Sequence, residues 1–162
     1  MAGLNTTRRG EALARDILLA DCQVVFTETA HLGLLDGLDL PGVRVIDIDS
    51  DEWRTTIAPY AGSEQIVDAT EPDDLFMLIF TSGTSGDPKA VRCTHAKISG
   101  PGSMLAERFG LSSADTVYLS MPMFHSNAMM AGWGVALAAE SSIALRRRFS
   151  RRDFLPTSAS SR

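Results

Sequence analysis

The stretch that decides the fold reads Leu75-Phe76-Met77-Leu78-Ile79-Phe80-Thr81-Ser82-Gly83-Thr84-Ser85-Gly86-Asp87-Pro88-Lys89. Its first six residues are all apolar, which predicts a strand buried on both faces. In the nine residues that follow, the glycines let the backbone turn so that successive N–H groups face one concavity. Hydroxyl side chains add donors without bulk, and the lysine adds a compact positive charge. The segment is therefore predicted to bind phosphate.

Seven residues carry this prediction, as hydroxyl donors, turn-forming glycines or the cation: Thr81, Ser82, Gly83, Thr84, Ser85, Gly86 and Lys89. A Walker A loop is excluded, because Gly83 and Gly86 are too close together and Ala90 stands where Ser or Thr should bind magnesium. Residues 90–94 also predict a strand, whereas a Walker loop opens a helix. The competing interpretation is a Ser/Gly-rich hairpin turn with a chance lysine, but nine residues exceed what a turn needs.

A second candidate element follows a predicted strand at residues 116–120 and reads Ser120-Met121-Pro122-Met123-Phe124-His125-Ser126-Asn127. The end of a strand is a common place for site residues in open α/β sheets. His125 is therefore a candidate site residue, and the alternative is a hydrogen-bonded loop histidine. Met121, Met123, Met129 and Met130 are consistent with a flexible apolar tunnel or with ordinary core packing.

These two elements resemble the phosphate-loop signature and the Pro-x-Phe-His element of the adenylate-forming (AMP-binding) superfamily, at about the family's usual spacing. The opening Leu4-Asn5-Thr6-Thr7-Arg8-Arg9-Gly10-Glu11-Ala12-Leu13 is similar to a weaker motif before the phosphate loop. Within the superfamily the chain most resembles fatty-acyl-CoA synthetases of the FadD type. One departure is Ala90, where the family usually has Gly.

The resemblance implies ATP-dependent activation of a fatty acid to an acyl-adenylate and then to an acyl-CoA, with ATP, Mg²⁺ and coenzyme A as cofactors or co-substrates. It implies that residues 81–86 and Lys89 bind the phosphates, that Lys89 also acts in catalysis, and that His125 lies at the acyl site. The expected partners are small molecules rather than nucleic acid, and a peripheral membrane contact of the full-length enzyme stays open. The alternative is a catalytically inactive remnant that binds nucleotide weakly at most, and an unrelated nucleoside triphosphatase is disfavoured by the Walker mismatch.

The resemblance covers about a third of the family's length. The Tyr-Gly-x-Thr-Glu block, the ribose-binding Asp, the hinge and the domain with the catalytic lysine have no counterpart here. We expect residues 1–149 to be part of a large N-terminal AMP-binding domain of class α/β, with mixed β-sheets flanked by helices. Residues 150–162 are expected to be an Arg/Ser-rich tail, disordered or non-native.

Composition is compatible with a folded enzyme fragment: 44% of the 162 residues are hydrophobic and the formal net charge is −5. The six arginines after residue 145 make a basic cluster, interpreted as a solvated or non-native segment rather than a nucleic-acid or lipid patch. Cys22 and Cys93 lie far apart and have no metal-ligand spacing, so no metal site is predicted and a reducing cytoplasm is expected. No secretory signal or run of about 18 apolar residues is present in the sequence.

The remaining pattern alternates helix and strand, as in an α/β layer. Helices are predicted at residues 8–20, 29–35, 52–58 and 126–139, with strands at 22–27, 43–48 and 142–145. Thr7 and Thr94 are the expected N-caps of the helices that follow them. Pro101 and Gly102 are expected to kink or interrupt the helix after Thr94. His95 is expected to cap or pack at that helix start, and Trp133 is expected in the core rather than gating a tunnel.

Overall fold

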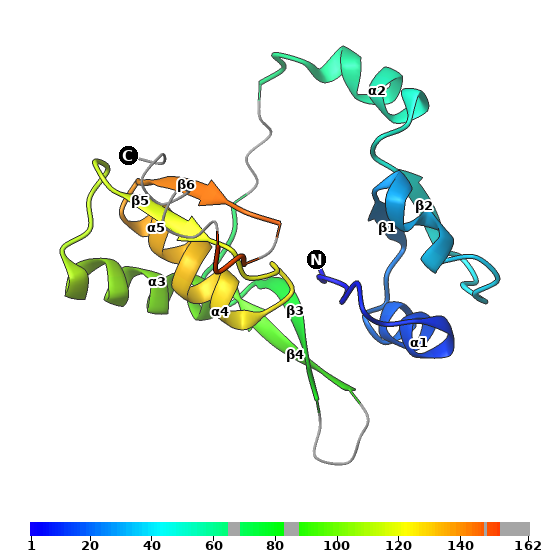
Figure 1. The fold of residues 1–162 in the computed structure, drawn as a ribbon, viewed down its shortest axis with the longest axis horizontal. Coiled ribbons are helices and arrows are strands. Elements are labelled where there is room, and N and C mark those ends of the chain that lie inside the picture. Colours follow the sequence, from blue (N-terminus) through cyan, green and yellow to red (C-terminus); the bar gives the residue numbers. More distant parts are fainter. Residues whose placement is uncertain (65–68, 83–87, 148, 153–162) are drawn as a thin grey trace. The chain divides into compact units, whose positions relative to one another are not determined.

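The computed structural model describes residues 1–64, 69–82, 88–147 and 149–152. They belong to two compact units, one formed by Met1–Gly3 with Thr70–Arg162 and the other by Leu4–Ala69. Figure 1 shows the elements of both units in chain order. No helix in the described ranges is long and apolar enough to cross a membrane.

The unit Leu4–Ala69 contains a parallel pair of strands with helices around it. Strand pairing joins Val25 to Val45 and Phe26 to Ile46 in register. Its elements are α1 (Gly10–Leu19), β1 (Val24–Thr27), the 3₁₀ helix η1 (Thr29–Leu34), β2 (Arg44–Asp47), α2 (Asp51–Ile57) and the 3₁₀ helix η2 (Ala58–Tyr60). Each predicted helix and strand of this region is confirmed within a few residues at its ends.

The core of this unit forms where one face of α1 meets β1. Leu13 and Ile17 are four residues apart, so they share a helix face, and both pack with Val25. Asp16 lies beside them and is buried, and it accepts two hydrogen bonds from the guanidinium of Arg8, at 2.9 and 3.0 Å. The carboxylate raises the pKa of Arg8, which stays charged. This fork-shaped ion pair fixes the segment that precedes α1.

The prediction that Thr7 caps α1 is wrong. The residue at the N-cap is Arg9, whose side chain makes no capping bond. Both the backbone N–H and the hydroxyl of Thr7 instead donate to Oδ1 of Asn5. Thr7 thus belongs to a local turn before the helix.

The other unit holds an antiparallel hairpin followed by a strand–helix–strand segment. The hairpin strands are β3 and β4, while β5 and β6 pair in parallel, with Val117 opposite Ile143. Its elements are β3 (Leu75–Ser82), β4 (Pro88–Thr94), α3 (His95–Phe109), β5 (Thr116–Leu119), α4 (Ser126–Ala128), the π-helical stretch η3 (Met129–Trp133), α5 (Gly134–Ala138) and β6 (Ser142–Leu145). All four predicted strands of this region are confirmed.

Only one face of β3 is deeply buried, so the prediction of burial on both faces is wrong for the described residues. Met77 and Ile79 pack with Cys93 of β4, Ile98 of α3 and Met129 of η3. The alternate residues Phe76 and Leu78 are half-buried. Within the described ranges the sheet of β3 has two strands, β3 and β4.

Helix α3 continues through Pro101 and Gly102, contrary to the predicted interruption. Proline removes one backbone hydrogen bond, and packing compensates for that loss. Gly102 lies against the backbone of Gly134, so α3 and α5 cross at very close approach: a Cβ on Gly102 would sit 2.4 Å from the carbonyl carbon and oxygen of Gly134. The predicted helix at residues 126–139 is confirmed, with a π-helical stretch in its middle.

The cap of α3 gives a first prediction. Oγ1 of Thr94 accepts a hydrogen bond from the backbone N–H of Lys97 at 3.3 Å, as the sequence predicted. We expect Thr94→Ala to lower the free energy of unfolding by about 1 kcal/mol, because the first turn then loses an acceptor. Urea unfolding monitored by circular dichroism measures this. Ser103→Ala, two turns further along the same helix and away from its cap, is the control, and an equal loss in both variants would contradict the capping role.

Candidate functional site

The base of the candidate phosphate segment is built by the β3–β4 hairpin. Antiparallel register places Thr81 opposite Lys89 and Ser82 opposite Pro88. The Thr81 hydroxyl donates to the Lys89 carbonyl oxygen at 3.5 Å. Thr81 and Lys89 are both exposed. The hairpin therefore brings the two ends of the segment together and presents a lysine and a hydroxyl to solvent at its end.

The middle of the segment lies outside the described residues. Gly83, Thr84, Ser85 and Gly86 belong to this middle, so their predicted phosphate contacts stay predictions. What the structure adds is the frame on which they are carried: two paired strands rather than a strand and a helix. This arrangement agrees with the exclusion of a Walker A loop from the sequence.

His125 stands at the start of α4, in the loop after β5. Its backbone N–H donates to the carbonyl of Pro122 at 3.0 Å, and its own carbonyl accepts from Ala128 at 3.1 Å. The imidazole tilts against the ring of Phe124, with 4.4 Å between centroids, and is exposed. The backbone of His125 thus forms the turn into the helix, while its ring remains accessible to a solute.

The hairpin that carries the phosphate segment and the helix that follows His125 pack together in one hydrophobic core. Antiparallel pairing puts Thr81 and Lys89 on the same strand face as Met77 and Cys93. Met129, one helical turn after His125, packs onto that face. The helix that begins at His125 therefore covers the face of the hairpin from which the candidate phosphate residues project. Sequence spacing alone did not predict this shared face.

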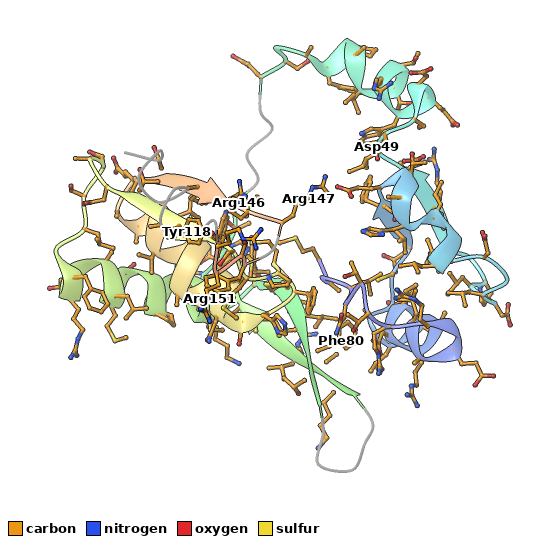
Figure 2. All side chains as sticks on the ribbon, in the orientation of Figure 1. Asp49, Phe80, Tyr118, Arg146, Arg147 and Arg151 are labelled. Carbon is orange, nitrogen blue, oxygen red and sulfur yellow. The ribbon has the colours of Figure 1, made fainter. Side chains whose placement is uncertain are left out.

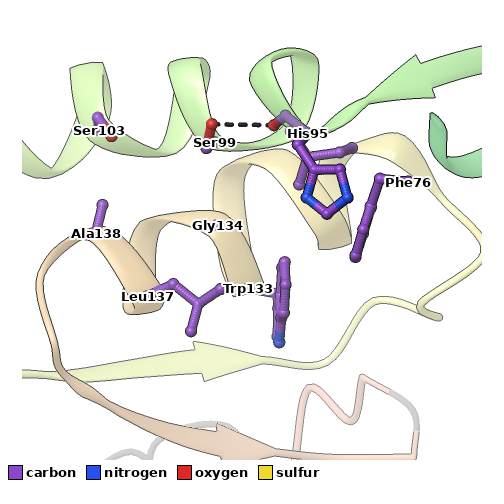
Figure 3. A pocket seen from close by; sticks show the side chains of 9 residues that line it. Phe76, His95, Ser99, Ser103, Trp133, Gly134, Leu137 and Ala138 are labelled. Atoms are coloured by element: carbon purple, nitrogen blue, oxygen red, sulfur yellow. Dashed lines mark hydrogen bonds between the residues drawn. The ribbon is translucent and has the colours of Figure 1, made fainter. Parts of the chain in front are cut away.

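A pocket of about 300 Å³ lies between α3 and α5 and contains none of the predicted phosphate or acyl residues. Phe76 contacts both His95 and Trp133, which Figure 3 labels: the Phe76 and Trp133 rings stack with centroids 5.6 Å apart, and His95 meets Phe76 edge-on at 5.0 Å. Ser99 donates to the His95 carbonyl at 2.9 Å. The predicted packing of His95 at the helix start is confirmed, and Trp133 packs partly buried against the core.

This pocket was not predicted from the sequence. Its lining comes from β3, α3 and the η3–α5 helix, and no local pattern links Phe76 to Leu137. The four candidate tunnel methionines also divide by position: Met129 is buried and Met130 packs beside it, whereas Met121 and Met123 are exposed. Core packing thus accounts for the first two.

The basic cluster begins directly after β6. The backbone N–H of Arg146 donates to the carbonyl of Leu119 at 2.8 Å, which extends the β5–β6 pairing by one residue. Arg146, Arg147 and Arg151 are labelled in Figure 2, and all three side chains are exposed. Across the described ranges, no three His, Cys, Asp or Glu side chains gather in a group that could hold a metal ion.

Comparison with known proteins gives a family match over almost the whole chain. The profile of the AMP-binding enzyme family matches residues 1–159. Over 153 residues the chain is 52% identical to a medium/long-chain-fatty-acid–CoA ligase, FadD17, from Mycobacterium marinum, a match that covers 94% of this chain and 29% of that protein. It is 38% identical to a steroid-22-oyl-CoA synthetase from Rhodococcus jostii, covering 96% of this chain and 29% of that protein. The chain thus spans less than a third of these relatives.

Solved structures also match the fold over nearly the whole chain. The crystal structure of ATP-bound MatB from Rhodopseudomonas palustris superposes with a TM-score of 0.82 at 21% identity, covering 99% of this chain and 32% of that one. O-succinylbenzoate coenzyme A synthetase (MenE) from Bacillus subtilis, in complex with AMP, gives a TM-score of 0.76 at 20% identity, covering 98% and 39%. The predicted class, a partial N-terminal domain with mixed β-sheets flanked by helices, is confirmed.

Proposed function

The chain belongs to the AMP-binding enzyme family, and on that premise we propose that it takes part in ATP-dependent activation of a fatty acid to an acyl-adenylate and then to an acyl-CoA. The observation that carries this proposal is the 52% identity to a medium/long-chain-fatty-acid–CoA ligase over 94% of the chain. The lower identity of 38% to the steroid-22-oyl-CoA synthetase favours a fatty acid over a steroid acid. The chain itself supplies the phosphate segment and one side of the acyl site.

Two displacements make up the reaction. An oxygen of the fatty acid carboxylate attacks the α-phosphorus of ATP, and the bond to the bridging oxygen breaks, so that pyrophosphate leaves. The sulfur of coenzyme A then attacks the acyl carbon, loses its proton to solvent or a base, and AMP leaves with the electrons of the acyl–oxygen bond. Both steps depend on positioning and on stabilising charge, which a loop of donors and a cation supply.

We assign the phosphate contacts to the segment carried by the hairpin. The residues are Thr81, Ser82, Gly83, Thr84, Ser85, Gly86 and Lys89. The exposed ammonium of Lys89, opposite Thr81 at the end of paired strands, supports a role in holding the β- and γ-phosphates and in stabilising negative charge on the departing pyrophosphate. The accessible ring of His125 supports its placement beside the acyl carboxylate.

Magnesium is expected to accompany the nucleotide. Mg²⁺ is commonly held by substrate phosphates, waters and one or two carboxylates. Among the described residues no three His, Cys, Asp or Glu side chains form a group that could hold a metal ion, and we name no ligand for Mg²⁺ in this part of the chain. Coenzyme A is proposed as the second substrate.

We propose that the protein works in the reducing cytoplasm. Cys22 and Cys93 are both free thiols. Burial raises the pKa of the Cys22 thiol. Free cysteines are usual in the cytoplasm.

We expect the 162-residue chain alone to produce no acyl-CoA above a control without enzyme. The adenine, ribose and catalytic-lysine elements implied by the family have no counterpart in its sequence. The measurement is dodecanoyl-CoA formation from ATP, Mg²⁺, dodecanoate and coenzyme A, followed by mass spectrometry. Clear turnover by the purified chain would show that these elements are dispensable.

The proposal itself is tested in a chimera. This chain replaces the matched residues of the Mycobacterium marinum relative, and dodecanoate is compared with a steroid-22-oate as substrate. We expect dodecanoyl-CoA to form at a rate within about tenfold of the parent, since a 52% identical segment should keep the site geometry. A folded but inactive chimera would favour the alternative, a catalytically inactive remnant.

A further inference from the structure

The first residues of the chain pair with β3 on the edge that β4 leaves open. The amino group of Met1 donates to the Phe76 carbonyl at 3.1 Å, and the Met1 carbonyl accepts from the backbone N–H of Leu78 at 2.8 Å. Ala2 forms a parallel bridge with Leu78. The segment Met1–Gly3 is thereby fixed to the strand that leads into the phosphate segment, although more than 70 residues separate them along the chain.

Gly3, the next residue, lies directly on the loop after β5. A Cβ placed on Gly3 would be 2.9 Å from both Cα and Cβ of Phe124 and 3.4 Å from its nitrogen. Real Cβ atoms essentially never approach that closely, and neither of these Phe124 carbons can rotate away. The contact therefore requires a residue without a side chain.

Phe124 connects this contact to His125. The two rings lie 4.4 Å apart, and the backbone N–H of His125 closes a turn onto Pro122 at 3.0 Å. A displacement of the Phe124 backbone would consequently move the imidazole. We propose that Gly3 is a positioning residue: it lets the segment Met1–Gly3 hold Phe124 against the edge of β3 and so fixes the orientation of His125.

The consequence concerns the two substrate sites. Because β3 continues into the phosphate segment, the same short segment ties the frame of the phosphate site to the loop of the acyl site. This consequence rests on the proposed function, in which His125 faces the acyl carboxylate. The positioning itself rests only on the contacts of Met1, Gly3 and Phe124.

Nuclear magnetic resonance of the 162-residue chain tests the proposal in two ways. In the unmodified chain, nuclear Overhauser effects are expected between the Gly3 Hα protons and the Hα and Hβ protons of Phe124. In the Gly3→Ala variant, the ring resonances of His125 are expected to shift, while those of His31 stay in place. Gly100→Ala is the matched control, because the same added methyl group meets nothing within 4 Å there. His125→Gln assigns the signal.

Titration with dodecanoate then separates the positioning role of Gly3 from the placement of His125 at the acyl site. A dodecanoate-dependent shift of the His125 ring that is lost in Gly3→Ala and kept in Gly100→Ala supports both. If dodecanoate leaves His125 of the unmodified chain unchanged, the acyl-site assignment fails, while the ring shift caused by Gly3→Ala still decides the positioning. Absence of the Gly3–Phe124 Overhauser effects, or His125 resonances that are identical in both glycine variants, overturns the proposal even if Gly3→Ala is poorly folded.

Discussion

Gly102→Ala should destabilise the chain by about 3 kcal/mol or more, although alanine is normally the better residue in a helix. The added Cβ would lie 2.4 Å from the carbonyl carbon and oxygen of Gly134, and those backbone atoms cannot turn aside. Helices α3 and α5 must then move apart, which opens the contact between Ala106, Val135 and Ala139. Single domains are usually stable by only about 5–15 kcal/mol, so this is a large share of the total.

The same change two residues earlier provides the control. Gly100 lies in α3 with open space where its Cβ would be. Gly100→Ala should stabilise the helix by about 0.5–1 kcal/mol, because alanine has less backbone entropy to lose. Urea unfolding of both variants gives the comparison. Equal stabilities would mean that the close crossing of α3 and α5 does not exist in solution.

Lys89→Ala should lower kcat/KM for ATP by about tenfold to a hundredfold in the chimera with the Mycobacterium marinum relative. The lost interaction is a charge-assisted contact with phosphate, worth about 1.5–3 kcal/mol, and each 1.36 kcal/mol is about a tenfold change in rate. Lys97 is the only other lysine in the sequence. Its Nζ donates to the carbonyl of Arg92, so Lys97→Ala removes an equal charge away from the proposed phosphate site.

Comparing Lys89→Ala with Lys97→Ala separates a phosphate contact from a general effect of net charge. Lys97→Ala is expected to leave kcat/KM for ATP within about twofold of the unmodified chimera, because a solvated surface charge contributes little. If both substitutions reduced it equally, the effect would reflect net charge rather than a phosphate contact. If neither did, phosphate binding by the segment would have to be abandoned.

Much of the fold was predictable because its elements have strong local signals. The apolar run at β3 and the alternating pattern at β2 each predicted a strand, and the structure has both. The hydroxyl of Thr94 predicted a helix start, and its capping bond is present. Thr7 gave the same signal and misled, because it lies two residues before the N-cap Arg9, in a turn that hydrogen-bonds to Asn5.

Contacts between distant segments were not predictable. Pro101 predicts a kinked or interrupted helix, and the uninterrupted α3 packs its next residue, Gly102, on Gly134. The pairing of Met1 with β3 and the contact of Gly3 with Phe124 join residues that no sequence spacing relates. For the candidate site, local sequence motifs identified Lys89 and His125, and the core showed that the helix after His125 covers the strand face of Lys89.

The central claim is that these residues take part in forming a fatty acyl-adenylate. Its most direct test is the exchange of labelled pyrophosphate into ATP by the chimera, in the absence of coenzyme A, so that only the first displacement is observed. We predict exchange that requires dodecanoate, that falls by about tenfold to a hundredfold in Lys89→Ala, and that is unchanged in Lys97→Ala. Exchange that proceeds without a fatty acid, or that is unchanged in Lys89→Ala, would contradict it.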